Sequence, residues 1–390
     1  MKNYDVIIVG GGMVGSSLAC LLAKAGVHVA VIEAFAPTAF NENDPHDLRV
    51  SAISHFSRSV LNNAGAWSHI EAMRISPYEQ MHVWDGTGDG EIHFDAAEIN
   101  EAQLGHIIEN RIIQLGLTQA LQQYETADLI CPAKLENFTI ENKTVLATLD
   151  NGDKLSAALI VGADGARSHV RDLANIPVDK NDYGQSGLVT VVETELENQS
   201  TAWQRFISTG PLAFLPLSKN QSSIVWTLPS DRADYMLSLS DDDFKTKLAE
   251  AVDYKLGNIT KLAQRAAFPL KGSQAESYVK PNIALIGDAA HTIHPLAGLG
   301  VNLGFKDAAK LAEVLLATKS TAQMGEFKIL RRYERARRGD NVITMKAMEA
   351  FRSLFGNTLN PVRQLRNFSL NLVNENKIIK HAFIRQAMGK

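Results

Sequence analysis

Residues 4–33, YDVIIVGGGMVGSSLACLLAKAGVHVAVIE, hold two apolar runs separated by a glycine-rich turn and a helical pattern. Residues 4–9 and 28–33 predict buried strands, and residues 14–25, rich in Leu and Ala, predict the helix between them. Strands joined through a crossover helix run parallel in a βαβ unit. The stretch therefore predicts an α/β fold built on a parallel sheet.

The turn after the first strand has the G-x-G-x-x-G spacing, formed by Gly10, Gly12 and Gly15. The first glycine permits a tight turn, the second lets a pyrophosphate approach the backbone, and the third lets the helix pack closely on the strand. The helix N-terminus offers N–H groups to the phosphates, and Glu33 can accept hydrogen bonds from ribose hydroxyls. The motif predicts a dinucleotide site; the alternative is a glycine-rich turn beside a solvated Glu33 in an unrelated α/β protein.

A second glycine motif, GADGARSHVR, occupies residues 162–171 after a predicted strand. It places Asp164 in a tight turn ahead of a short helix. The turn can serve a cofactor, and it can equally be an ordinary Asp-Gly turn that caps the helix.

A third motif, GDAAHTIHPLAGLGVN at residues 287–302, indicates that the bound dinucleotide is FAD and not NAD. Asp288 ends a buried strand and can accept a hydrogen bond from a ribityl or ribose hydroxyl. Backbone N–H groups from Gly298 to Asn302 can meet the pyrimidine edge of an isoalloxazine ring. The helix beginning at Val301 favours the negative charge of a reduced flavin. A glycine-rich strand-to-helix turn without a ligand is the alternative.

The charge of the chain is unevenly distributed. The 390 residues carry 39 Lys and Arg against 43 Asp and Glu, so we expect no nucleic-acid partner. Residues 331–390, however, carry 13 Lys and Arg against 4 Asp and Glu. This basic region permits three interpretations: a solvated face, a docking surface for partner proteins, or a patch that meets anionic lipid.

The two cysteines, Cys20 and Cys131, are far apart and have no metal-binding spacing. We therefore expect neither a disulfide framework nor a metal site, and a cytoplasmic location. The first residues do not form a signal peptide, and no run of about 18 apolar residues predicts a transmembrane helix. Any membrane contact is expected to be peripheral, at the inner membrane.

The remaining periodicity predicts an interrupted nucleotide-binding domain. We expect a loop at residues 34–48, helices at 56–73 and 104–124, and a hairpin at 81–95. Alternating strands are expected at 187–228, followed by a helix at 301–317 and a wholly helical C-terminal end. The expected division is an FAD-binding domain of residues 1–75, 104–182 and 270–320, a β-rich substrate domain of residues 76–103 and 183–269, and a basic helical C-terminal region of residues 321–390.

Four segments together resemble one known family: VGGGMVG (9–15), DLRVSAIS (47–54), GADGARS (162–168) and GDAAHTIHPLAGLGVNLG (287–304). The sequence resembles the FAD-dependent ubiquinone-biosynthesis hydroxylases, which are group A aromatic flavoprotein monooxygenases. The likeness extends over nearly the whole chain, through LGHIIEN (104–110), LAFLPL (212–217) and LRRYERAR (330–337). It implies a para-hydroxybenzoate hydroxylase-like fold: a Rossmann-like FAD-binding domain with an inserted β-sheet substrate domain and a helical C-terminal region.

The resemblance also implies a reaction. NADPH or NADH reduces FAD, O₂ adds to the reduced flavin as a C4a-hydroperoxide, and an oxygen atom passes to an electron-rich phenol. Within the family the sequence resembles the bacterial 2-polyprenylphenol 6-hydroxylases, which implies a polyprenylated phenol as substrate and other ubiquinone-biosynthesis proteins as partners. The alternatives are a sibling hydroxylase at the demethoxyubiquinol or methoxyphenol step, a hydroxylase of small soluble aromatics, and a scaffold without activity.

Site residues follow from the resemblance position by position. Those implied to bind the cofactor are Gly10, Gly12, Gly15 and Glu33 at the ADP half, Arg49 and Asn110 at the flavin or phosphates, Asp164 in the turn shared with nicotinamide, Asp288 at the ribityl chain, and Gly298, Gly300, Val301 and Asn302 along the ring. The family usually has Gln where this chain has Leu299, so a polar side-chain role is not expected there.

Two residues of the third motif are candidates for catalysis. Pro295 lies at the expected reactive edge of the flavin, and His294 beside it can assist phenol deprotonation because imidazole titrates near neutrality. The alternative for His294 is an inert residue held extended before a proline. We interpret His291 as structural. Four aromatic residues of the strands can either roof a substrate cavity or belong to the core: Trp203, Phe206, Phe214 and Trp226.

Overall fold

A six-stranded sheet forms the centre of the computed structural model, which describes residues 1–293, 300–355, 357 and 359–389. Its strands come from segments far apart in the sequence and, except for the antiparallel β20, run parallel. Their order is β20 (Val279–Lys280), β21 (Ile283–Leu285), β13 (Leu159–Gly162), β2 (Val6–Val9), β3 (Val29–Ile32) and β9 (Ala127–Ile130). The four inner strands are buried along their whole length, as both faces of a parallel sheet are covered.

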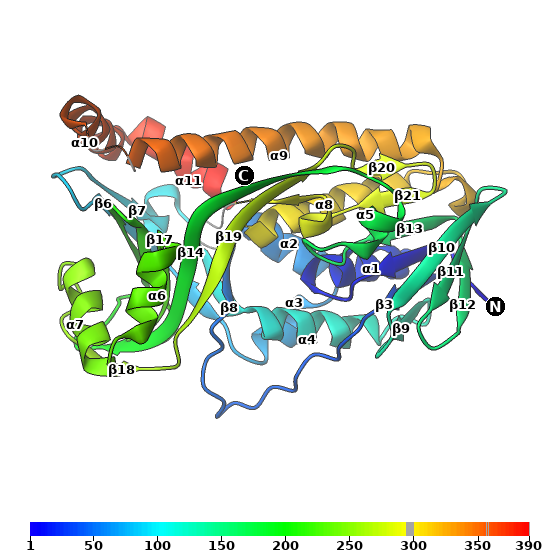
Figure 1. Ribbon diagram of the computed structural model, residues 1–390, viewed down its shortest axis with the longest axis horizontal. Helices are drawn as coiled ribbons and strands as arrows, with labels where there is room; N and C mark the ends of the chain where they lie inside the picture. The colour runs from blue at the N-terminus through cyan, green and yellow to red at the C-terminus, as the bar shows by residue number, and fades with distance from the viewer. Residues whose placement is uncertain (294–299, 356, 358, 390) are drawn as a thin grey trace.

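Helices pack beside this sheet in a row (Figure 1). The helix α1 (Met13–Lys24) lies between α4 (Asn110–Leu121) and α8 (Gly300–Leu316), and α9 (Phe327–Phe355) packs on α8. Shorter helices adjoin them: α2 (His55–Asn63), α3 (Trp67–Glu71) and α5 (His169–Leu173). A small sheet flanks the row, in the order β1 (Lys2–Asn3), β12 (Lys154–Ala157), β11 (Thr144–Leu149) and β10 (Leu135–Glu141).

A second large sheet lies at the other end of the molecule, and its long strands β14 and β19 reach back toward the first (Figure 1). Its order is β22 (His291–Thr292), β19 (Ala266–Ala275), β14 (Val178–Thr194), β17 (Gln221–Pro229), β16 (Gly210–Pro216), β15 (Thr201–Ile207), β6 (Gln80–Asp85) and β7 (Glu91–Asp95), with β18 (Ile259–Leu262) also pairing with β14. The helices α6 (Ser230–Ser238) and α7 (Asp241–Ala251) cover one face and close a separate apolar core.

A three-stranded sheet occupies the space between the two large sheets, in the order β4 (Val50–Ile53), β8 (Gly105–Glu109) and β5 (Ser76–Tyr78). Two C-terminal helices, α10 (Asn360–Glu375) and α11 (Lys377–Met388), pack near β7 at the edge of the second sheet. Within the described part of the chain, every helix is too short or too polar to cross a bilayer.

The fold class expected from the sequence is confirmed, but two expected helices were wrong. The segment 104–124 opens as strand β8, whose five residues are all buried, and becomes helical only from Asn110. The segment 56–73 is two helices, because Gly65 between them takes φ +78°. The loop at 34–48 and the hairpin at 81–95 are confirmed. The expected domain boundaries at 182/183 and 269/270 fall inside β14 and β19, so that division stays a prediction.

Candidate active site

A cavity of about 490 Å³ lies between the two large sheets. One side is formed by the glycine turn and the start of α8, and the other by strands of the second sheet. Its lining includes six of the residues predicted to bind the cofactor: Gly12, Arg49, Asn110, Asp288, Gly300 and Val301. Residues distant in the sequence therefore meet at one site.

The glycines of the first turn divide into two kinds. Gly10 has φ +104°, and a Cβ there would lie 2.4 Å from the carbonyl oxygen of Ala163. A Cβ on Gly15 would lie 2.0 Å from the carbonyl oxygen of Gly10. Gly12 has no heavy atom within 4 Å of a Cβ and lines the cavity. Gly10 and Gly15 thus allow the backbone to pack, whereas Gly12 leaves room for a ligand.

The first turn of α1 is open toward the cavity. No side chain caps the helix at Gly12, so its first N–H groups can bind an anion. The Glu33 carboxylate accepts hydrogen bonds from Gly11 N at 2.7 Å and Phe35 N at 3.0 Å, and Glu33 is outside the cavity lining, so its contact with a ribose stays a prediction. These bonds hold the turn against the end of β3.

Arg49 precedes β4 and Asn110 follows β8 as the first residue of α4, and because β4 and β8 pair, both residues line the cavity together. The amide N–H of Asn110 donates to Arg49 O at 3.0 Å, and the Asn110 side-chain oxygen accepts from Ser51 Oγ at 2.7 Å. The Arg49 side chain is exposed, and its guanidinium lies 6.0 Å from the centre of the Phe268 ring. Phe268 belongs to β19, so it connects this pair to the second sheet.

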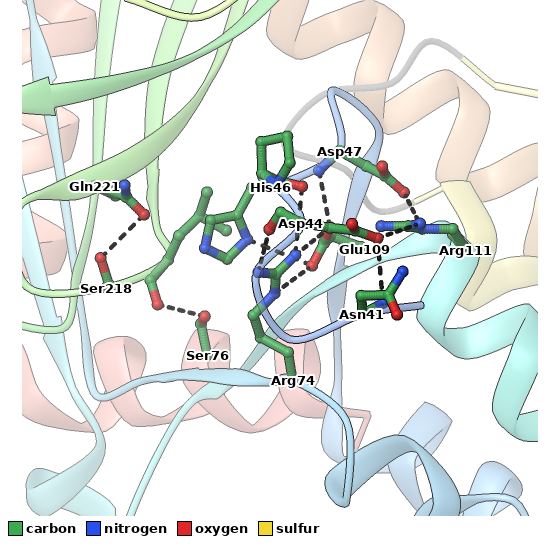
Figure 2. A network of polar contacts seen from close by, with 12 residues as sticks. Asn41, Asp44, His46, Asp47, Arg74, Ser76, Glu109, Arg111, Ser218 and Gln221 are labelled. Carbon is green, nitrogen blue, oxygen red and sulfur yellow. Dashed lines mark hydrogen bonds and ion pairs between the residues drawn. The ribbon is translucent and has the colours of Figure 1, made fainter. Parts of the chain in front are cut away.

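The loop that leads to Arg49 is held by an ionic network around the buried Glu109, which Figure 2 shows. Glu109 accepts two hydrogen bonds from Arg74, at 2.9 and 3.0 Å, and one from Asp47 N at 2.8 Å. Arg111 contacts Asp47 and Asp44 at 3.0 and 3.1 Å. Burial alone would raise the pKa of Glu109, but the hydrogen bonds from its neighbours and the charge of Arg74 outweigh burial and lower it to about 2.

Asp288 lies in a short 3₁₀ turn, Gly287–Ala289, that follows β21. Its side chain is open to the solvent of the cavity, while Gly287 takes φ +58° to turn the chain. Packing of protein atoms around the carboxylate raises its pKa, and the charges of His291 and Arg49 oppose that shift. The carboxylate is therefore available to hydrogen-bond a hydroxyl of a ligand.

A buried aspartate supports this turn from behind. Asp307 Oδ2 accepts from Gly287 N at 3.1 Å and lies 2.5 Å from His291 Nε2, while its Oδ1 accepts from Arg337 Nε at 2.8 Å and from Asn341 at 3.3 Å. Burial would raise the pKa of Asp307, but the facing His291 and Arg337 lower it. His291 is structural, as expected.

Besides Glu33, two predicted site residues have side chains outside the cavity lining. Asp164 accepts from the N–H groups of His169 and Val170 at 2.7 and 3.1 Å and so caps α5. Asn302 accepts from Ser54 N at 3.1 Å and donates to Ala52 O at 2.8 Å, which fastens α8 to β4. Their cofactor roles remain predictions. His294, Pro295, Gly298 and Leu299 lie outside the described residues.

The four aromatic residues that could have covered a substrate cavity pack within the protein instead. Phe206, Phe214 and Trp226 are buried in apolar cores, and Trp203 stacks on His82 with ring centres 5.2 Å apart. The sequence analysis missed Phe268, Glu109, Asp307 and Arg337. Asp307 could have been found from the sequence, because it is a charged residue at a position of α8 where the helical pattern expects an apolar one.

Comparison with known proteins identifies the family. A family model described as an FAD binding domain matches residues 3–344. The chain is 38% identical over 386 residues to the 3-demethoxyubiquinol 3-hydroxylase of Escherichia coli K12, covering 99% of this chain and 98% of that protein. It is 36% identical to ubiquinone hydroxylase UbiL of Rhodospirillum rubrum, covering 100% of this chain and 90% of that protein.

The fold is similar to that of a monooxygenase of known structure. The crystal structure of p-nitrophenol 4-monooxygenase from Pseudomonas putida DLL-E4 matches with a TM-score of 0.79 at 19% identity, covering 100% of this chain and 99% of that one. This likeness concerns the fold alone.

The residues around the cavity fit FAD. The space at Gly12 and the uncapped start of α1 suit a diphosphate, and Asp288 suits a polyol hydroxyl farther along the cavity. The described residues hold no group of three or more His, Cys, Asp or Glu placed to bind a metal ion. The chain belongs to the FAD-dependent ubiquinone-biosynthesis hydroxylases, and it is an aromatic-ring flavoprotein monooxygenase with FAD as cofactor and NAD(P)H as co-substrate.

Proposed function

We propose that this chain hydroxylates the ring of a polyprenylated demethoxyubiquinol, with O₂ as the oxygen source. The proposal is supported by identity over nearly the full length with a 3-demethoxyubiquinol 3-hydroxylase. The sequence analysis expected 2-polyprenylphenol 6-hydroxylase instead, and the reported relatives support the sibling ring position better. The ring position is thus revised.

In this proposal the walls of the cavity position both the cofactor and the ring. Gly12 and the start of α1 hold the diphosphate, Asp288 holds the ribityl chain, and Arg49 balances the negative charge of the phosphates. Bound FAD, once reduced, supplies the activated oxygen. Gly300 and Val301 begin α8 beside the ring position, where the helix N-terminus stabilises developing negative charge.

The observation that carries the proposal is the apolar wall opposite the glycine turn. Val189, Val225, Phe268 and Leu270 line it from three strands of the second sheet. Such a wall suits a ring without a carboxylate and excludes water from the reacting atoms.

The alternative of a small aromatic acid would need a free cation in the cavity. Arg49 and Lys271 line it, but in this proposal Arg49 is engaged by the FAD phosphates. Lys271 lies 3.7 Å from Asp182. A substrate carboxylate would compete with both, so this wall favours the uncharged ring of a quinol.

Quinone analysis in cells that lack this chain tests the ring position. We expect a demethoxy-quinone to accumulate, and the wild-type gene to restore ubiquinone. A polyprenylphenol without its first added ring hydroxyl would instead identify the 6-hydroxylase step. Complementation with the Asp288→Ala variant is the matched control, because that change should remove the flavin and leave the chain folded.

Spectroscopy of the purified protein tests the enzymatic mechanism. We expect flavin absorbance that NAD(P)H bleaches and air restores, with bleaching accelerated by a demethoxyubiquinol analogue. A colourless protein that FAD cannot reconstitute would exclude hydroxylation of a quinol and of a small aromatic acid alike. The remaining hypothesis would be a scaffold protein without activity.

A further inference from the structure

Helix α10 turns three polar side chains toward the protein. Asn367, Asn371 and Asn374 lie at helical spacing on one face, and their side-chain oxygens accept hydrogen bonds from three backbone N–H groups of residues 90–93 at 2.8, 3.0 and 3.1 Å. These groups belong to β7 and the residue before it, at the edge of the second sheet. The asparagines therefore satisfy an unpaired sheet edge.

The opposite face of α10 is apolar and exposed. Leu365, Phe368 and Leu372 follow one another at i, i+3 and i+7, and their exposed fractions are 63%, 65% and 48%. A helix on a folded domain normally buries its large apolar side chains and exposes its amides. Here the asparagines lie against the sheet and much of the apolar surface faces outward.

Helix α11 continues this exposed apolar surface. Its inner face packs Ile384 and Met388, which are 3% and 2% exposed, while Ile378 and Phe383 are 83% and 51% exposed. Ile378 follows α10 closely, because only Asn376 separates the two helices. Both helices thus expose large apolar side chains to solvent.

The net charge of these two helices is positive. Residues 359–389 carry five Lys and Arg against one Glu. Arg366 pairs with Asp85, and Lys380 pairs with Glu98 at 2.7 Å, so both are neutralised within the protein. Lys377 and Arg385 are exposed on α11, beside the apolar residues.

We propose that α10 and α11 form a docking face for an anionic lipid surface, made of Leu365, Phe368, Leu372, Ile378 and Phe383 with Lys377 and Arg385. Large apolar side chains on outer helices, accompanied by cations, bind at the headgroup boundary of a bilayer through apolar burial and electrostatic attraction together. Figure 1 shows α10 at one end of the molecule, at its periphery, where a flat surface can reach it.

Docking also places the active site near the lipid. The asparagines join α10 to β7, and β7 belongs to the same sheet as β14, β17 and β19, which line the cavity. The sheet that forms the apolar wall is therefore held beside the bilayer when the docking face binds.

Vesicle flotation with the purified holoenzyme tests the proposal. We expect the protein to float with vesicles of phosphatidylcholine containing about one third phosphatidylglycerol, more weakly with phosphatidylcholine alone, and less at high salt. The double variant Leu365→Ser with Phe368→Ser should lower the partition coefficient roughly tenfold or more. Lys377→Gln with Arg385→Gln should remove the preference for anionic vesicles.

The matched control removes two exposed apolar side chains elsewhere, Ile140→Ser with Leu196→Ser, which are 40% and 53% exposed. It should float like the wild type, and all variants should keep their flavin content and melting temperature. Failure of the wild type to float, or equal flotation of the double variant, would overturn the proposal. So would an oligomer in light scattering that the double variant dissolves, because a second copy or a partner protein would then cover the face.

Discussion

Asp307→Asn is expected to lower the free energy of unfolding by about 3 kcal/mol. The side chain is completely buried, and the amide keeps its size while removing its charge. Breaking a buried ion pair from one side costs about 3–5 kcal/mol, because the other charge stays buried. Arg337 would remain buried, but it keeps Asp340 at 2.9 Å, which places the cost at the lower end of that range.

The matched control is Asp340→Asn, which removes the second carboxylate on Arg337. Asp340 is 68% exposed, so its loss should cost less than about 1 kcal/mol. Denaturant unfolding of the two variants measures the difference. Equal costs, or a cost below about 1 kcal/mol for Asp307→Asn, would refute the assignment of a buried charge pair.

The same variant should also weaken FAD retention. Asp307 accepts from Gly287 N, and this bond fixes the turn that carries Asp288. Flavin absorbance after gel filtration measures retention, and Asp340→Asn should keep its flavin. Full retention by Asp307→Asn would show that the turn holds its shape without the carboxylate.

Three further changes test the site. Asp288→Ala should abolish FAD retention with an unchanged circular dichroism spectrum, and a normal flavin content would contradict its assignment. Gly15→Ala should lower the free energy of unfolding by about 1–3 kcal/mol or more, because the added Cβ would lie 2.0 Å from Gly10 O, whereas Gly12→Ala should leave thermal stability unchanged. Because the pKa of Glu109 falls from 4.5 to about 2 on folding, its ionisation contributes roughly 3 kcal/mol that is present above about pH 4.5 and lost toward pH 2. Denaturant titrations should show a shallower acid loss for Glu109→Gln, and parallel pH profiles would contradict it.

Sequence patterns correctly predicted those helices, strands and turns whose conformation depends on residues adjacent in the sequence. The βαβ unit and the glycine turn were correct because strand, turn and helix are consecutive in the sequence. The segment at 105–109 was predicted as helix because a short, fully buried apolar run has no period that distinguishes strand from helix. Only its pairing with β4 and β5 made it a strand.

The candidate site was predictable where a motif supplies its own geometry. Gly12 and Asp288 line the cavity because each lies in the turn that follows a strand of the same parallel sheet, and the carboxyl ends of such strands meet at one edge. Asn302 belonged to a motif as well, yet its amide bonds Ser54 and Ala52, far away in the sequence. No local pattern reports such a partner.

The sequence by itself determined the fold class and FAD as the cofactor, because glycine spacing and strand ends act within a few residues, and the resemblance of its motifs indicated the family. Tertiary structure alone decided that Asp307 is a buried counterion to Arg337, and that Glu109 holds the loop before Arg49. It also decided which side of α10 faces the protein. Periodicity distinguishes the two faces of a helix, but it does not say which face lies inward. The unpaired edge of β7 makes the asparagine face the inner one, because the N–H groups of an edge strand need acceptors.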